Sequence, residues 1–274
     1  MAIFTLSTSS NYSAIKGSLA NGDTIRIDTN AVRLTVDEQP LLTNITVDSP
    51  GVSGRMTVSG AYDLATWAIV AGTVTLIDGA FPSGATLGSA TASATGGTQH
   101  AIASNNGTVL VAIGGGAASA RGINFNSGKV GSAVGGSGIQ AFGVGTNFAT
   151  VGNATGGTGS NANGVNTNNS CVTTATAGAG PGAAGVNINN GICLRAFDSG
   201  ASVAITQLIG GPKLIIGPDY QTATTSYSFV EKIYSIGEVS PLAAIPGTIE
   251  IVLLSEGAGA GFTGIRGTHR TLGT

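Results

Sequence analysis

The most regular feature of the chain is a pattern of apolar, small and polar residues that recurs every 21 positions between about residues 88 and 192. Rows that start at Val109, Val130, Val151 and Val172 align without a gap, and a row that starts at Gly88 joins the pattern late. Equivalent positions hold small residues, as in Ala112, Ala133, Ala154, Ala175 and Ala196, and in Gly115, Gly136, Gly157 and Gly178. A repeat of this length predicts one supersecondary unit per row, stacked on its neighbours.

The repeating unit should be built from strands. Glycine is too frequent for a helix, where each glycine costs about 1 kcal/mol. Each row has two strand-like pieces, such as Val109–Ile113 and Ala118–Phe125, separated by glycine-rich or Asn-Gly turns. The pattern therefore predicts an all-β fold, a parallel β-helix or β-solenoid with coils of about 21 residues. Five rows would make a rod on the order of 25 Å long, at one strand spacing per row.

Two positions of the repeat suggest specific structural roles. A β-branched position should form a core stack inside the coil. It is occupied by Ile102, Ile123, Val144, Val165 and Val186. An asparagine position should form an amide ladder at a corner, each side chain bonding to the next along the axis. It is occupied by Asn105, Asn126, Asn147, Asn168 and Asn189.

Two further positions carry only alanine or glycine. They are occupied by Ala120, Ala141, Ala162 and Ala183, and by Gly122, Gly143, Gly164 and Gly185. In a regular strand they would face away from the β-branched position, on the outside of the coil. The resulting flat face would either pack closely against another chain or border solvent.

The flanks of the repeat are less regular. Residues 1–87 are rich in strand candidates such as Ile25–Ile27 and Val32–Val36, and we expect them to form an irregular capping or attachment region. Residues 88–207 form the repeat solenoid. Residues 208–274 contain strand candidates and a glycine-rich, basic tail, which predicts a small C-terminal β region or a flexible end.

The composition argues against some classes of binding partner. Charged residues make up only 9% of the 274 residues and the net charge is −2, so neither nucleic acid nor an anionic membrane is an expected partner. Hydrophobic residues reach 42%, which argues against disorder despite the 45 glycines. So little charge predicts that the protein is either sparsely solvated or has much of its surface in an assembly. The first residues resemble no signal peptide and no stretch could span a bilayer, so we expect synthesis in a cytoplasm and no membrane insertion.

The repeat lacks the residues that catalysis needs. Residues 88–192 contain no Asp or Glu, and their only charges are Arg121 and Lys129, so a two-carboxylate glycosidase site on the coils is not expected. The two histidines, His100 and His269, are too few for a metal site or a catalytic triad, and His100 should lie on the surface. Cys171 and Cys193 should be buried free thiols in adjacent coils. We therefore predict a non-enzymatic protein with no catalytic, metal or cofactor residues.

The segment Asn21–Ile27, followed by Val32–Val36, resembles the opening of many tailed-bacteriophage virion proteins, in which a similar phrase starts the first coil of a β-helix. This resemblance implies a homotrimer in the virion, attached to capsid or tail proteins. It predicts a capsid decoration or head-fibre component. A tail fibre or receptor-binding adhesin that contacts a host surface glycan is the alternative. A cellular β-solenoid adhesin or an ice-binding protein is a further one.

Overall fold

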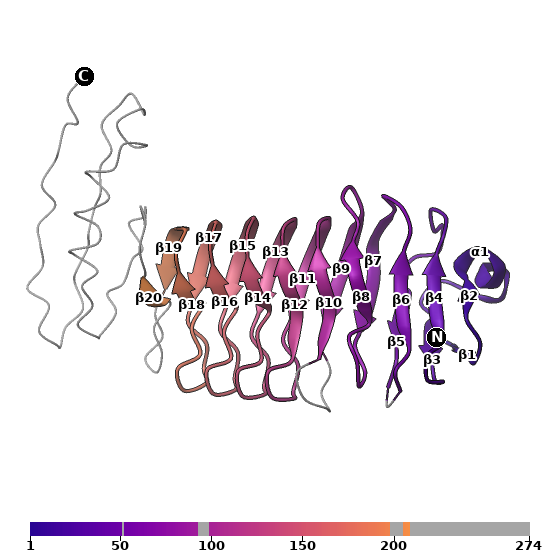
Figure 1. The fold of residues 1–274 in the computed structure, drawn as a ribbon, viewed down its shortest axis with the longest axis horizontal. Coiled ribbons are helices and arrows are strands. Elements are labelled where there is room, and N and C mark those ends of the chain that lie inside the picture. The colour runs from indigo at the N-terminus through magenta and orange to yellow at the C-terminus, as the bar shows by residue number, and fades with distance from the viewer. Residues whose placement is uncertain (51, 93–98, 198–204, 209–274) are drawn as a thin grey trace, which may run out of the picture.

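The computed structural model describes residues 1–50, 52–92, 99–197 and 205–208. Over these residues the chain is a β-solenoid of about nine coils, which confirms the predicted fold class. Figure 1 shows the coils side by side along one axis, with the N-terminal strands and the one α-helix at the same end. All strand pairs described are parallel, because each strand pairs with its equivalent one coil further on.

The described strands form three sheets. The ten-stranded sheet contains β1 (Ile3–Leu6), β3 (Thr24–Ile27), β5 (Thr46–Asp48), β7 (Asp63–Val70), β9 (Thr86–Thr91), β11 (Thr108–Ile113), β13 (Lys129–Val134), β15 (Thr150–Thr155), β17 (Cys171–Thr176) and β19 (Ile192–Phe197). The seven-stranded sheet contains β8 (Ile77–Phe81), β10 (His100–Asn105), β12 (Arg121–Asn126), β14 (Val144–Asn147), β16 (Val165–Asn168), β18 (Val186–Asn189) and β20 (Ile205–Leu208). The three-stranded sheet contains β2 (Ser10–Asn11), β4 (Arg33–Val36) and β6 (Arg55–Val58).

The pairing register explains why the repeat is visible in only part of the sequence. In residues 99–192, which we call the shaft, Val109 pairs with Val130 and Ile123 with Val144, an offset of 21 residues. In the coils before it, Ile25 pairs with Val47, an offset of 22 residues, and Ser10 with Leu34, an offset of 24. These entry coils continue the same ten-stranded sheet. Their varying length hides the repeat from a row-by-row alignment.

The size of the buried side chains changes along the axis of the solenoid. The entry coils enclose large side chains, of which Trp67, Tyr12 and Phe81 are the bulkiest that are fully buried. The shaft encloses mainly valine and alanine, such as Val151, Ala154 and Ala175, each without exposed surface. At the N-terminal end, α1 (Tyr12–Ile15) and the 3-10 helix η1 (Lys16–Ser18) close the first coil. The Tyr12 ring packs edge-on against Trp67 at 5.4 Å, which covers the apolar interior.

The prediction of an outer alanine and glycine face is wrong. Ala120 and its equivalents have no exposed surface, and Gly122 is also buried. The reason is that Gly122 and Ile123, although consecutive, are both buried where the chain enters β12. A Cβ atom on Gly122 would lie 2.6 Å from the Ile113 nitrogen and 2.8 Å from the Gly143 oxygen. The small residues therefore allow opposite walls of the coil to approach each other.

The predicted C-terminal region, residues 208–274, lies outside the described residues apart from Leu208, and so does His269.

Candidate functional site

The five asparagines of the repeat lie in one column at the end of the strands of the seven-stranded sheet, and all are fully buried. The Nδ2 of each of the first four asparagines donates to the Oδ1 of the next, and the Nδ2 of Asn189 is buried without a partner among the described residues. The distances are 2.8 Å from Asn105 to Asn126, 2.8 Å from Asn126 to Asn147, 2.8 Å from Asn147 to Asn168, and 2.6 Å from Asn168 to Asn189. The column is thus a continuous amide ladder along the rod.

The first four amides also close the turns that follow them. The Oδ1 of Asn147 accepts the N–H of Ala149 at 3.2 Å, and its Nδ2 donates to the Ala149 carbonyl at 2.8 Å. The same pair of contacts joins Asn105 to Gly107. One side chain therefore satisfies the buried backbone of the turn and links two coils, which makes the ladder structural.

The β-branched stack lies beside the ladder. Ile102, Ile123, Val144, Val165 and Val186 are Cα partners in successive coils and have no exposed surface. Burying one such side chain contributes about 1.5–3 kcal/mol, so this column also stabilises the stack of coils.

The two cysteines and His100 are wholly or partly buried in the coils. Cys171 is half-buried rather than buried and Cys193 is buried, and the two cysteines form no disulfide. His100 is half-buried, which corrects the expectation of a surface residue. Burial, together with the nearby positive charge of Arg121, lowers the pKa of His100 to about 4. Arg121 lies over the Phe142 ring at 5.4 Å and donates to Asn124.

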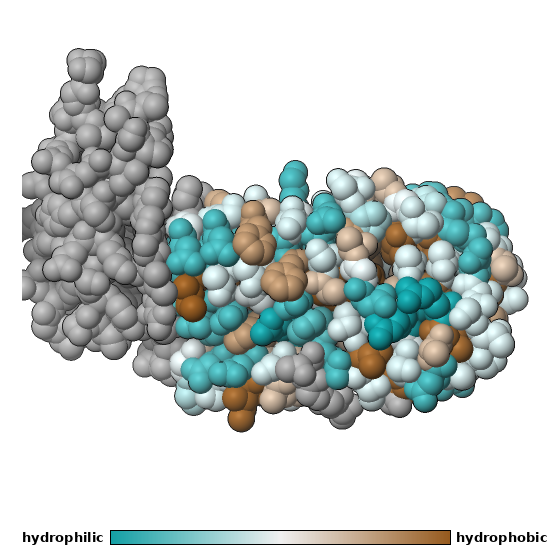
Figure 2. All heavy atoms as spheres, viewed as in Figure 1, coloured by the Kyte–Doolittle hydropathy of each residue, from teal (hydrophilic) through white to brown (hydrophobic). Residues whose placement is uncertain are grey.

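A charged cluster on the outer face of the entry coils was not predicted. Arg33 and Arg55 are Cα partners on β4 and β6, and both reach Asp78 on β8. Arg55 Nη1 lies 2.8 Å from Asp78 Oδ2, while the Arg33 contacts are longer, at 3.3 and 3.4 Å. Figure 2 shows strongly hydrophilic side chains gathered over this part of the rod. The sequence offered no signal for it, because the entry coils lack a constant period.

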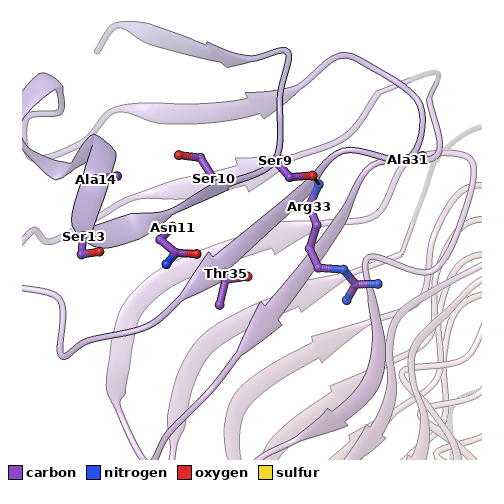
Figure 3. A pocket seen from close by; sticks show the side chains of 8 residues that line it. All are labelled: Ser9, Ser10, Asn11, Ser13, Ala14, Ala31, Arg33 and Thr35. Atoms are coloured by element: carbon purple, nitrogen blue, oxygen red, sulfur yellow. Dashed lines mark hydrogen bonds between the residues drawn. The ribbon is translucent and has the colours of Figure 1, made fainter.

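A polar hollow of about 560 Å³ lies next to this cluster (Figure 3). It is lined by Ser9, Ser10, Asn11, Ser13, Ala14, Ala31, Arg33 and Thr35. The strand pair β2–β4 forms its floor, because Asn11 and Thr35 are Cα partners. On the α1 side, the Ser13 hydroxyl donates to Asp37 at 2.6 Å and lowers the pKa of that carboxyl. Hydroxyls, one amide and one guanidinium can together bind a polar molecule.

A second hollow runs along the shaft, beside the ten-stranded sheet. This axial groove also has a volume of about 560 Å³. Its lining includes Ile113, Val134 and Thr155 together with the glycine-rich segments that follow them, such as Gly114–Gly116, and none of its lining residues is charged. It suits an uncharged partner.

No helix in the described part of the chain is long and apolar enough to cross a bilayer. The described residues also hold no group of three or more His, Cys, Asp or Glu side chains that could bind a metal ion. The chain matches no known family model, no curated protein and no solved structure.

Proposed function

We propose that the protein is a non-enzymatic structural component of a tailed-phage virion, a capsid decoration or head fibre, and that it assembles as a homo-oligomer, most simply a trimer. The observation that carries the proposal is an uncharged outer face that runs along the shaft. The phage resemblance of Asn21–Ile27 supplies the kind of particle.

The uncharged face consists of a ridge and the axial groove beside it. The ridge is a column of β-branched residues in consecutive strands of the ten-stranded sheet, each half-buried. It contains Val70, Thr91, Ile113, Val134, Thr155 and Thr176. Such residues suit packing against another sheet surface.

A second copy of the chain is the partner that fits this face. Its ridge has the same spacing between coils, so it can follow the groove over several coils. Neither surface carries a charge that would have to be desolvated. The ridge residues Ile113, Val134 and Thr155 also form one wall of the groove, so the face is one continuous surface. Three copies can bring this surface together around a three-fold axis, and a contact that joins different parts of the surface closes into a ring when its rotation closes. A three-fold ring would leave no groove open.

The oligomer is tested by light scattering on the purified chain and two variants. Thr155→Arg places a charge on the ridge, and Thr167→Arg places the same charge on the outer face of the seven-stranded sheet, where Thr167 is equally half-buried. We expect wild type and Thr167→Arg to have about three times the chain mass of 26.7 kDa, and Thr155→Arg to fall to the monomer mass. A monomeric wild type at micromolar concentration would contradict the oligomer. An unchanged Thr155→Arg would place the contact elsewhere.

The location in a virion is tested by imaging intact particles that carry a labelled copy of the protein. Label on the capsid surface would support a decoration or head-fibre role, and label at the tail tip would favour the receptor-binding alternative. Particles without label would contradict both.

A further inference from the structure

We propose that the polar hollow beside Arg33 binds a hydroxylated carboxylate, the chemistry of an acidic sugar residue. This site would be independent of the axial groove and of the particle in which the protein works. The outer face of the entry coils carries an excess of positive charge beside this hollow.

Two arginines in register share one carboxylate. Like charges directly opposite each other on neighbouring strands destabilise a sheet, and here Arg33 and Arg55 have only Asp78 as an anionic partner among the described ion pairs. Asp78 contacts both guanidinium groups, Arg55 at 2.8 Å and Arg33 at 3.3 and 3.4 Å, so the three side chains together carry one net positive charge. An incoming anion would offset it.

Arg33 is also held in place before any ligand arrives. Its Nη1 donates to Thr57 Oγ1 at 2.6 Å, and its backbone N–H donates to Ser9 Oγ at 3.0 Å. Within the described residues, its Nε has no hydrogen-bond partner, and Nη2 has only the 3.4 Å contact to Asp78. A guanidinium with two donors on one edge matches the two oxygens of a carboxylate.

The size and lining of the hollow indicate a sugar rather than a bare ion. A volume of about 560 Å³ is in the range of small-molecule sites and far larger than one inorganic anion requires. Ser9, Ser10, Asn11 and Thr35 supply hydroxyl and amide groups for ligand hydroxyls, and Ala14 and Ala31 supply small apolar contacts.

An acidic group on the α1 side of the hollow favours a single orientation of the ligand. Asp37 accepts both the hydroxyl and the backbone N–H of Ser13, at 2.6 and 3.0 Å. This places negative charge on the α1 side of the hollow. A ligand carboxylate would therefore lie at the Arg33 side, with hydroxyls toward α1.

Calorimetry with trigalacturonate, maltotriose and inorganic phosphate as probes tests the proposal. We expect trigalacturonate to bind the wild type. Maltotriose should bind at least about tenfold more weakly because it lacks the charge-assisted contact, and inorganic phosphate at least about tenfold more weakly because it lacks the sugar hydroxyls. Arg33→Gln should weaken trigalacturonate binding by about tenfold or more. Asp78→Asn should tighten it, because it leaves both arginines without their carboxylate. Arg26→Gln is the matched control, since Arg26 pairs with Asp48 through two nitrogens on another face and should bind as wild type does.

Several outcomes would overturn the site. Absence of trigalacturonate binding at millimolar concentration would do so, and so would equal binding of maltotriose. Equal binding of phosphate would show an anion site that does not recognise the sugar. A thermal melt shows whether Arg33→Gln is folded. If it is not, the binding of trigalacturonate to Asp78→Asn tests the site alone. Unchanged or weaker binding by that variant contradicts the proposal. None of these outcomes bears on the oligomer, which is measured separately by mass.

Discussion

The side-chain amide of a buried asparagine in the ladder links two coils and also closes a turn. Asn147 donates to Asn168 at 2.8 Å and to the Ala149 carbonyl at 2.8 Å, and its oxygen accepts from Asn126 and from the Ala149 N–H. Both the donor and the acceptor of the amide are therefore needed at this fully buried position. Aspartate has nearly the same shape but no donor when it is ionised.

Asn147→Asp should therefore destabilise the protein by about 3 kcal/mol or more, because it buries a charge and leaves two acceptors unpaired. Asn166→Asp is the control: Asn166 is half-buried on the outer face, and its oxygen only accepts a bond from Asn187 at 3.0 Å, which a carboxylate also does. Its cost should stay below about 1 kcal/mol. Chemical denaturation measures both, and equal costs would show that the ladder contributes nothing special.

The structural role of a residue could be predicted from the sequence only where the repeat length is constant. The ladder and the β-branched stack were readable because one residue type returns every 21 positions in the shaft. Arg33, Arg55 and Asp78 were not readable, because β4, β6 and β8 belong to coils of unequal length, so no alignment brings them into one row.

The strands of the shaft are short, and the glycines between them determine how closely the sheets approach. The sequence predicted strands near Val109–Ile113 and Ala118–Phe125, and the structure has Thr108–Ile113 and Arg121–Asn126. It failed to place Gly122, because strict alternation of faces does not hold where two consecutive residues are both buried. Propensity and alternation alone carry no information on such close contacts between opposite walls.

Gly122→Ala tests this contact. The added methyl would meet the backbone at Ile113 and Gly143, which cannot move independently of the sheet, so we expect a loss of about 3 kcal/mol or more in unfolding free energy. Gly79→Ala, in β8, is the control because a Cβ there has nothing within 4 Å, and it should be neutral or slightly stabilising. A small, equal effect of both variants would mean that the walls are not in contact.

In the described part of the chain, the ion pairs and the regular repeat lie in different segments. All four described ion pairs lie in the entry coils, and the shaft offers uncharged surfaces along its length. This division supports a rod that associates through its shaft and meets a charged ligand near its N-terminal end. Composition alone predicted the sparse charge of the chain but not where the charges would gather.

The central claim is that the shaft is built from interchangeable coils held in vertical register, and excising one coil tests it most directly. Deleting residues 144–164 removes one 21-residue coil and should bring Asn126 over Asn168 and Ile123 over Val165, the positions that Asn147 and Val144 now separate. We expect a cooperative thermal melt within several degrees of wild type. Deleting residues 144–154 instead should abolish the cooperative melt, because the columns no longer match. Equal damage from the two deletions would contradict the account.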